Sequence, residues 1–346
     1  MKTNKRITIY DLARELNLAP STVSKAINDK PSVSDQIKAI VKAKAQELNY
    51  KHNLHAANLR TGSSKTVAVV VPKIDVSFFA DVIAGMEEAC FENNHRLIIC
   101  QSDESYIKEV QNVQTLIQQN VDCILISIST ETARFEHLQE VMDHGIALIQ
   151  LDRVNESIQC DTVVNDNKQA AYRAAKHLIK QGYSRIAFLG GPDHIALYRD
   201  RKAGYLKAME EAGLHVPYDY VQQHVITMDA GMERATALLQ STAPPDAFFT
   251  ISDMTALGVL NAAKSLGLSV PQEVGIVGFA NEKFTELVTP TITSVNQNSR
   301  VLGKEAANIY FRGLRDERSV SGKKKPAQHV VKTSLAIRDS SAGPSR

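Results

Sequence analysis

Residues 7–28 read ITIYDLARELNLAPSTVSKAIN, and a longer amphipathic stretch follows at 34–48. In the first part, apolar residues recur at the i, i+3, i+4 and i+7 spacing of one helix face, at Ile9, Leu12, Ala13 and Leu16. Asn17 and Leu18 are predicted to form a turn, and Pro20 suits the first position of the next helix. The stretch therefore predicts two short helices joined by a tight turn.

The second helix is predicted to have two unlike faces. On a wheel of about 100° per residue, its apolar residues gather on one side, at Val23, Ala26 and Ile27. Polar residues lie opposite, at Ser21, Lys25 and Asn28. Such a helix buries an aliphatic stripe and presents hydroxyl, ammonium and amide groups outward, which is how small domains place side chains in the major groove of DNA.

A third helix is predicted after Ser34, which can cap it. Its inward face is predicted at Ile37, Ile40, Val41, Ala45 and Leu48. Spacing alone leaves open a small helical bundle with a solvated polar face, but the charge favours DNA. Residues 1–65 contain 12 Lys and Arg against 5 Asp and Glu, whereas residues 66–346 contain 28 against 33. So basic a segment attracts phosphates, and its binding should weaken as salt rises.

At this point the sequence resembles the LacI/GalR family of bacterial transcription regulators. The matching motifs are TIYDLA at 8–13, STVSKAIN at 21–28, VS at 33–34, LNY at 48–50, and residues 53–59 ahead of Gly62. The resemblance continues to about residue 338, which is nearly the whole chain. Three positions depart from the usual pattern: Ala19 stands for a common serine, Lys25 for a common arginine and His52 for a common proline.

The resemblance implies that the second helix reads DNA. We expect contacts to base edges from Ser21, Thr22 and Lys25, with an added apolar contact from Pro20. Phosphate contacts position the head without specifying sequence, and they are expected from Tyr10, Ser24, Asn28, Ser34, Tyr50 and Asn53.

The resemblance also implies a second DNA-binding element at 54–60, LHAANLR. A segment this short is not a stable helix in water, because helix nucleation is costly. In the family this segment folds only on DNA, where it pairs with the same segment of the other subunit. Leu59 is expected to wedge open a base step in the minor groove, with Ala56 small enough for close approach. The expected boundaries are 1–52 for a helix-turn-helix DNA-binding domain and 53–65 for a hinge helix and linker.

The rest of the chain is long enough for more than one core, because the whole has 346 residues. No apolar run approaches the ~20 residues of a membrane span, and no signal-peptide stretch follows the N-terminal MKTNKR. A cytoplasmic protein is therefore expected. The cysteines are scattered and fit small core residues in a reducing compartment: Cys90, Cys100, Cys123 and Cys160.

From residue 66 onward, short apolar runs alternate with helical patterns. Strands are predicted at 67–71, 97–100, 123–126, 147–151, 186–189, 247–251 and 274–279. Helices are predicted at 79–93, 107–120, 135–144, 168–181, 205–212, 232–239 and 256–266. This β-α alternation predicts parallel sheets with helices on both faces.

The resemblance adds the architecture: an all-α helix-turn-helix head and an α/β core of two doubly wound lobes, like periplasmic binding proteins. The chain should cross between the lobes near 160–162, 291–294 and 320–325. The effector-binding domain, 66–338, then divides into lobe 1 (about 66–160 and 294–322) and lobe 2 (about 161–292 and 325–338). Residues 339–346 are expected to be a disordered tail.

Ligands of such sheets bind beyond the carboxyl ends of the strands. The residues that follow the predicted strands include Asp75, Ser77, Phe78, Ser102, Ser127 and Asp152. The resemblance adds an effector-holding arginine at Arg201, a site aspartate at Asp253 and a hinge or site glutamine at Gln297. These groups suit a polyhydroxylated ligand, and Phe78 can stack on a sugar ring. Roughly half of them should instead be turn formers or helix caps.

One departure concerns the ligand directly. In the family the strand at 275–279 is usually followed by an effector-binding aspartate, but here Ala280 and Asn281 follow. Either Asn281 supplies the polar contact, or the effector differs from a simple neutral sugar.

Motifs for enzyme chemistry do not occur in the sequence: there is no HExxH, no GxSxG, no P-loop and no GxGxxG after the first strand. The histidines show no metal-ligand spacing, so no catalytic residue, cofactor or metal is expected. Two other classes remain as alternatives. One is a sugar-binding receptor without DNA function, which the basic head argues against; the other is an α/β enzyme such as a sugar kinase with a DNA-binding appendage, which would lack its phosphate loop.

The sequence thus predicts a ligand-responsive, sequence-specific DNA-binding regulator, expected to be a repressor, although activation also fits. We expect a homodimer, because one head contacts few base pairs and pseudo-palindromic operators mirror twofold symmetry. A sugar or sugar derivative between the lobes would change whether the hinge segments can pair, so effector and DNA affinities would change reciprocally. The direction of that change is left open.

Overall fold

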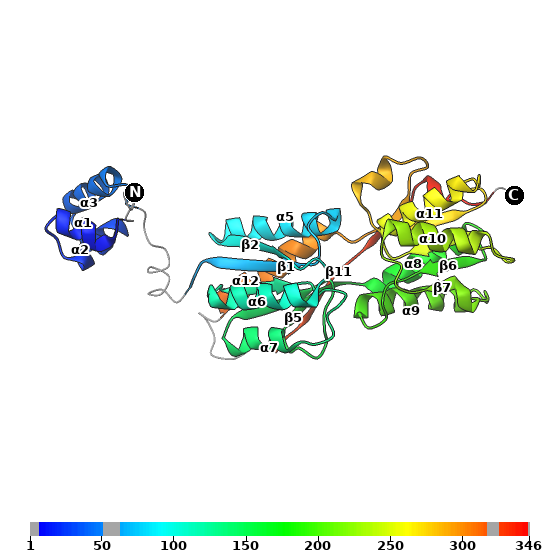
Figure 1. Ribbon diagram of the computed structural model, residues 1–346, viewed down its shortest axis with the longest axis horizontal. Coiled ribbons are helices and arrows are strands. Elements are labelled where there is room, and N and C mark those ends of the chain that lie inside the picture. The colour runs from blue at the N-terminus through cyan, green and yellow to red at the C-terminus, as the bar shows by residue number, and fades with distance from the viewer. Residues whose placement is uncertain (1–6, 51–62, 317–324, 345–346) are drawn as a thin grey trace. The chain divides into compact units, whose positions relative to one another are not determined.

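The computed structural model describes residues 7–50, 63–316 and 325–344, which form two compact units that divide at residue 64 (Figure 1). We call the first unit the head and the second the body. The head contains three helices: α1 (Ile9–Glu15), α2 (Pro20–Ile27) and α3 (Asp35–Glu47). The predicted hinge contacts of Asn53, Ala56 and Leu59 lie outside the described residues.

The helices of the head begin where the sequence predicts. At the start of α1, the backbone N–H of Thr8 donates to the Asp11 carboxylate at 3.0 Å, and the Asp11 N–H donates back to the Thr8 hydroxyl at 3.3 Å. The hydroxyl of Ser34 caps α3. Asn17, with φ of 53°, makes the turn before Pro20 begins α2. This confirms two helices joined by a tight turn.

The core of the head consists mainly of the predicted apolar faces. Fully buried side chains come from all three helices: Leu12, Val23, Ala26 and Val41. The prediction for Ile40 is wrong, because its side chain is 50% exposed. Val41 points into the core, and Ile40 lies about 100° around the helix from it, beyond the edge of the apolar stripe.

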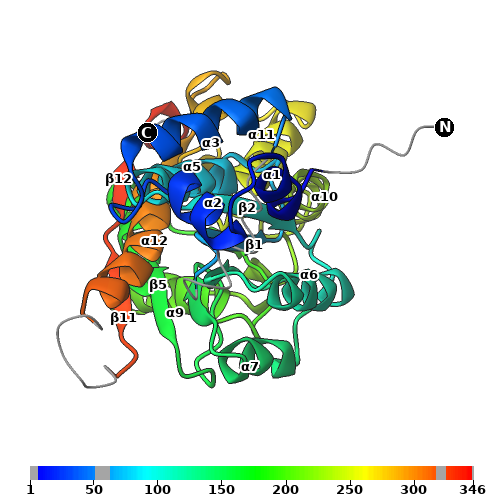
Figure 2. The ribbon, with the colours of Figure 1, turned by 90° about the vertical axis from the view of Figure 1, so that its left-hand side faces the viewer.

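The body contains two six-stranded sheets, each with helices on both faces (Figure 1). The sheet of lobe 1 is parallel, in the order β11-β5-β4-β3-β1-β2. Its strands are β1 (Thr66–Val71), β2 (Arg96–Gln101), β3 (Cys123–Ile126), β4 (Ala147–Leu151), β5 (Asp161–Asn165) and β11 (Gln328–Val331). One face is covered by α5 (Ser77–Glu92) and α12 (Ser299–Asp316), and the other by α6 (Tyr106–Gln118) and α7 (Glu136–Asp143) (Figure 2).

Lobe 2 has the sheet order β12-β10-β9-β8-β6-β7, parallel except that β12 is antiparallel to β10. Its strands are β6 (Ile186–Leu189), β7 (Val221–Gln222), β8 (Ala247–Thr250), β9 (Gly275–Ala280), β10 (Thr293–Asn296) and β12 (Ser334–Ala336). Its helices are α8 (Asn167–Lys180) and α9 (Ala196–Glu211) on one face, and α10 (Met228–Leu239) and α11 (Asp253–Ser265) on the other. Short 3₁₀ turns are η1 (Tyr218–Tyr220), η2 (Lys283–Glu286) and η3 (Asp339–Ser341). The predicted class, a helix-turn-helix head with two doubly wound lobes, is confirmed.

The chain crosses between the lobes after β5, after β10 and after β11, which corrects the expected lobe boundaries. β5 pairs with β4 in lobe 1, β10 pairs with β9 in lobe 2, and β11 pairs with β5 in lobe 1. The crossings expected near 160–162, 291–294 and 320–325 are therefore placed too early. Each of these strands is short and rich in polar residues, and the chain leaves a lobe only after the strand has completed its ladder.

Buried amides join the three crossings. The amide nitrogen of Asn165 donates to the carbonyl oxygens of Gln297 at 2.9 Å and Val331 at 3.1 Å. The side-chain amide of Gln297 donates back to the Asn165 Oδ1 at 2.9 Å. Since both side chains are buried, each polar atom needs such a partner. The result is one hydrogen-bonded network that joins the three crossing segments, which we call the hinge.

The expected disordered tail is wrong for residues 339–341, which form η3. Ser340 and Ser341 are fully buried. The Ser340 hydroxyl donates to the Ile276 carbonyl at 2.7 Å and accepts from the Thr293 N–H at 2.9 Å. His177 Nε2 lies 2.8 Å from the Ser341 hydroxyl. Ser340 thus satisfies backbone groups of β9 and β10, and Ser341 contacts a side chain of α8, so this segment belongs to lobe 2.

None of the helices in the described ranges combines the length and apolar character needed to cross a membrane.

Helices α5 and α12 pack closely because each has a glycine at the contact. A Cβ atom added to Gly85 would overlap the carbonyl oxygen of Arg300, and one added to Gly303 would overlap that of Val82. In contrast, a Cβ at Gly313, near the end of α12, would meet no atom within 4 Å.

We predict that Gly85→Ala lowers the free energy of unfolding of the body by about 1–3 kcal/mol, because backbone atoms must move to admit the methyl group. Gly313→Ala is the matched control, and it should be neutral or slightly stabilising, because alanine favours helix. Chemical denaturation of both variants tests this. Equal losses of stability would contradict the close approach of the two helices.

Candidate functional site

Helix α2 presents a polar surface to solvent. Pro20, Ser21 and Lys25 are exposed, whereas Thr22 and Ser24 are half-buried beside them. The buried side chains of this helix, Val23 and Ala26, hold the opposite side against the core. The structure therefore brings the predicted base-reading residues together on one face, and their contacts with DNA remain a prediction.

Lys25, like Lys30, differs from the three lysines of α3. Lys38, Lys42 and Lys44 form ion pairs within the head, at 3.0, 2.6 and 2.7 Å from Asp35, Asp29 and Glu47. In the described part of the head, no acidic side chain pairs with Lys25. Its ammonium group is thus free to meet an acceptor on another molecule.

The predicted phosphate contacts are less uniform. Tyr10 is 67% exposed, and its ring projects from α1. The amide nitrogen of Asn28 donates to the Ser24 carbonyl at 2.7 Å, and the Ser34 hydroxyl caps α3. Tyr50 packs partly against the core of the head. Asn28 and Ser34 therefore have roles within the head, which explains their residue types without DNA.

A cleft of about 370 Å³ lies between the two lobes of the body. Half of the predicted effector residues line it: Asp75, Phe78, Asp152, Arg201 and Gln297. They come from both lobes and from the hinge. The cleft lies beyond the carboxyl ends of the strands, where ligands of open α/β sheets bind.

The other predicted effector residues support the loops around the cleft but do not line it. The hydroxyl of Ser102 lies 2.8 Å from that of Ser129, and Ser127 donates to Asp152 at 3.5 Å. Ser77 donates to Glu282 at 2.6 Å.

Asn281 accepts from Arg338 at 2.7 Å, so the expectation that it reaches the ligand is not supported by its position. Asp253 is fully buried, accepting from the Ser294 hydroxyl at 2.6 Å and from the Glu282 N–H at 2.7 Å. These residues hold the loop that carries Glu282.

Arg201 occupies the lobe 2 side of the cleft in a fixed orientation. Its Nε donates to Asn167 at 2.9 Å and its Nη1 donates to the Ile251 carbonyl at 2.8 Å. Its guanidinium carbon lies 3.6 Å from the centre of the Phe279 ring. Burial lowers the pKa of Arg201 to about 10, so the group remains a cation at neutral pH.

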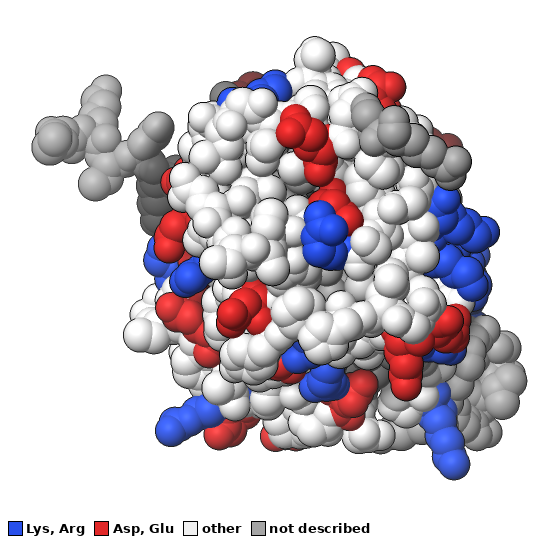
Figure 3. Space-filling model, turned by 90° about the vertical axis from the view of Figure 1, so that its right-hand side faces the viewer, with Lys and Arg blue, Asp and Glu red and all other residues white. Residues whose placement is uncertain are grey.

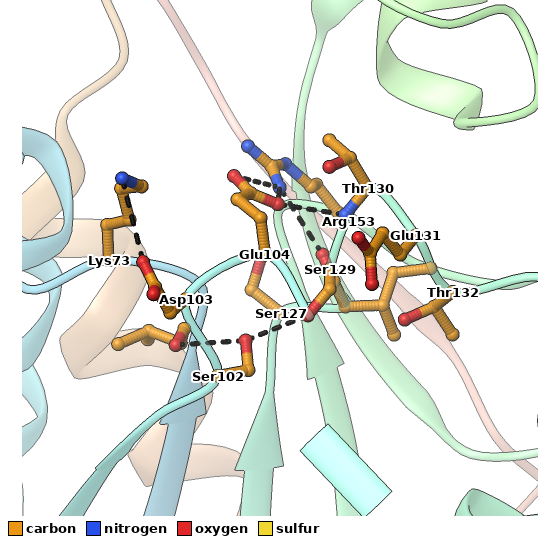
Figure 4. A network of polar contacts seen from close by, with 12 residues as sticks. Lys73, Ser102, Asp103, Glu104, Ser127, Ser129, Thr130, Glu131, Thr132 and Arg153 are labelled. Carbon is orange, nitrogen blue, oxygen red and sulfur yellow. Dashed lines mark hydrogen bonds and ion pairs between the residues drawn. The ribbon is translucent and has the colours of Figure 1, made fainter. Parts of the chain in front are cut away.

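On the lobe 1 side, a second arginine is already paired. Arg153 Nη1 donates to both oxygens of Glu104, at 2.9 and 2.7 Å (Figure 4). Glu104 also accepts from the Thr130 N–H at 2.8 Å, and Lys73 lies 3.7 Å from Asp103 in the same loop cluster (Figure 4). Most of these polar groups satisfy one another and hold the loops after β2 and β3 in place.

Several cleft residues were not expected from the sequence. Glu104, Glu282 and Tyr198 line the cleft, together with apolar walls from Phe79, Ile226, Met228, Met254 and Phe279. The acidic residues had a detectable signal, since each lies within three residues of a strand end. Tyr198 lies in the first turn of α9, which begins nine residues earlier than its sequence pattern.

The outer end of lobe 2 differs in charge from the head. Basic and acidic side chains are intermixed there, with large uncharged areas between them (Figure 3). Such a face gives no broad attraction for phosphates. Within the described ranges, no three His, Cys, Asp or Glu side chains are grouped to hold a metal ion.

Comparison with known families covers both units of the chain. Residues 8–53 match the model for bacterial regulatory proteins of the lacI family. Residues 64–324 match the model for periplasmic binding proteins and the sugar-binding domain of the LacI family.

Individual proteins are similar over nearly the whole chain. Catabolite control protein A of Priestia megaterium is 30% identical over 90% of this chain and 93% of its own. The HTH-type transcriptional repressor PurR of Vibrio campbellii is 31% identical over 90% of this chain and 92% of its own. The solved complex of transcriptional regulator CelR with cellobiose has a TM-score of 0.72 at 27% identity, covering 97% of this chain and 100% of that one.

The buried Asp253 should make stability depend on pH. Burial raises its pKa to about 7 from a usual 3.8, so the folded chain holds this proton more tightly than the unfolded chain. The stabilisation is complete below pH 3.8 and is lost as pH rises towards about 7. We predict that Asp253→Asn removes this loss, so the variant gains stability relative to the unmodified chain between about pH 4 and 7. Chemical denaturation of both chains at several pH values measures the difference in their free energies of unfolding. A difference that does not change with pH would contradict the prediction.

Proposed function

The chain belongs to the lacI family of bacterial regulatory proteins, and from this premise we propose that it binds a specific operator as a homodimer, with an affinity that a sugar or sugar derivative in the cleft switches. It is a transcriptional regulator, and its relatives named above are regulators rather than enzymes. We expect a repressor that acts in the cytoplasm, where its DNA target is.

The observation that carries the proposal is that one chain combines an unpaired cation on an exposed recognition helix with a polar cleft between two hinged lobes. The first feature suits DNA, in which guanine offers acceptors that lysine reaches. The second suits a small molecule. A single chain with both is suited to report the presence of that molecule as a change in DNA binding.

The chemistry of the cleft supports a sugar. Aromatic rings at Phe78 and Tyr198 line the cleft and offer faces on which an apolar sugar face can stack. Arg201, Asp75 and Gln297 offer donors and acceptors to hydroxyl groups at the ring edge. The similar regulator CelR was solved in complex with cellobiose, a disaccharide, and this supports a sugar as the ligand class proposed here.

The switch we propose is a change in the angle between the lobes. In the structure the lobes touch across the cleft, where His194 Nε2 of lobe 2 lies 2.8 Å from the Thr130 carbonyl oxygen of lobe 1. A ligand that favours one lobe angle favours one spacing of the hinge segments in a dimer. By linkage, DNA then changes ligand affinity by the same factor. The minor-groove wedge at Leu59 remains part of this proposal.

An edge of lobe 1 supports the homodimer. β2 is the terminal strand of its sheet and pairs only with β1 among the described strands. Three exposed apolar side chains lie on this strand and the adjacent helices: Phe91 on α5, Ile99 on β2 and Ile107 on α6. Exposed apolar groups around an unpaired strand edge are typical of a contact surface.

DNA binding is tested with a duplex enriched from a random pool by the purified chain. We predict that Lys25→Ala weakens binding of the chain to this duplex by about 1–3 kcal/mol, measured by fluorescence anisotropy. The ratio of its affinity for this duplex to its affinity for random DNA should also fall. Lys42 pairs with Asp29, so Lys42→Ala is the control and should change the DNA affinity little.

The ligand response is tested with the same duplex. Adding a mono- or disaccharide should shift the affinity of the chain for DNA at least about fivefold, and Arg201→Gln should abolish only this shift. Failure to enrich any duplex would instead favour a receptor without DNA function.

Self-association has its own test. Phe91→Glu should weaken the dimer by at least about tenfold in Kd, because a charge would be buried in the apolar contact. Ile337→Glu is the control, since Ile337 is also exposed but lies on lobe 2. Sedimentation of both variants over a concentration series measures the effect. Unchanged association of the Phe91 variant would exclude this edge as the interface.

A further inference from the structure

We propose that Glu282 sets the charge of the ligand: it selects an uncharged or cationic sugar and excludes phosphorylated ones. The inference rests on the proposed function, in which the cleft binds a sugar. It concerns the loop that follows β9, and it names the acidic residue that this loop brings to the cleft.

The loop after β9 is shaped to deliver Glu282 to the cleft. Ala280 has φ of 124° and Asn281 has φ of 58°, so two consecutive residues other than glycine lie in the left-handed region. Such strain persists only where surrounding contacts fix it. Here the Asn281 N–H donates to the Ser294 hydroxyl at 2.9 Å, and the Glu282 N–H donates to Asp253 at 2.7 Å.

The Glu282 side chain has one satisfied and one open oxygen. It lines the cleft although it is only 7% exposed. Its Oε2 accepts from the hydroxyl of Ser77, across the cleft on lobe 1, at 2.6 Å. Within residues 7–50, 63–316 and 325–344, Oε1 has no hydrogen-bond partner and no cation pairs with the carboxylate. Oε1 is not among the fully buried unpaired atoms of the described residues, so it is accessible from the cleft, where a ligand hydroxyl or ammonium group can donate to it.

The other charges of the cleft do not compensate for Glu282. Four carboxylates line the cleft, at Asp75, Glu104, Asp152 and Glu282, against three cations at Lys73, Arg153 and Arg201. Glu104 already neutralises Arg153, and Asp152 interacts electrostatically with Arg201. Lys73 lies near Asp103, at a half-exposed position. A phosphate group beside Glu282 would therefore meet a like charge in a place with little water, where repulsion is strong.

The test compares matched ligands on the full chain by isothermal titration calorimetry. The probes are glucose, glucosamine and glucose 6-phosphate, with ribose, ribose 5-phosphate and cellobiose as a second set. We expect at least one uncharged or amino sugar to bind, and its phosphorylated counterpart to bind at least tenfold more weakly. Glu282→Gln should weaken binding of the parent sugar about tenfold and should reduce the discrimination against the phosphate by a similar factor.

Two variants serve as controls. Glu233→Gln makes the same chemical change at an exposed position of α10. It should alter neither the affinity for the parent sugar nor the discrimination against the phosphorylated sugar. Ser77→Ala keeps the carboxylate but removes the hydroxyl that holds it, so the parent sugar should bind several-fold more weakly while the phosphate stays excluded. This second variant keeps the inference testable if Glu282→Gln does not fold.

The outcomes separate the two claims. Glucose 6-phosphate or ribose 5-phosphate binding as tightly as its parent, or discrimination that survives in Glu282→Gln, would overturn this inference and leave a ligand-responsive regulator standing. Loss of phosphate exclusion in Ser77→Ala would also overturn it. If no sugar of either kind binds, the proposed sugar response fails, and the role of Glu282 fails with it.

Discussion

The amide of Asn165 is the contact on which the body depends. Three segments far apart in sequence must run side by side between the lobes, and each exposes backbone groups where it leaves a sheet. Asn165 and Gln297 satisfy several of these groups inside a buried site, which fixes how the three crossings lie against one another. Because Gln297 also lines the cleft, a ligand bound there would lie directly at the hinge.

Much of the fold follows from periodicity. The apolar face of α1, the buried run of β1 and the helices α5 to α8 have patterns that burial alone explains, and the structure places them within a few residues of the prediction. β5 and β10 were missed because their sequences, DTVVN and TSVN, mix hydroxyl and amide side chains into short strands. The 18-residue helix α12 was missed although it buries Leu302 and Ala306, because its charged residues interrupt the apolar stripe.

The site was less predictable than the fold. Residues that directly follow strands include both residues that line the cleft, such as Asp152, and residues that only hold loops, such as Ser102 and Asp253. The difference depends on backbone turns that sequence position does not determine. Glu282 shows this best: it reaches the cleft only because the two residues before it adopt left-handed conformations, and nothing in their side chains requires that.

The interleaved topology has a consequence for synthesis on the ribosome. The core of lobe 1 includes side chains of α12, and its sheet ends with β11 at 328–331. Although the first strand of this lobe emerges early, its core stays incomplete until nearly the whole polypeptide has been translated. Lobe 2 waits as well, for β12 and the serines of η3. Only the head, whose core comes from residues 9–50, can fold while the remainder is still being made, so a nascent chain offers its DNA-binding helices before the cleft between the lobes exists.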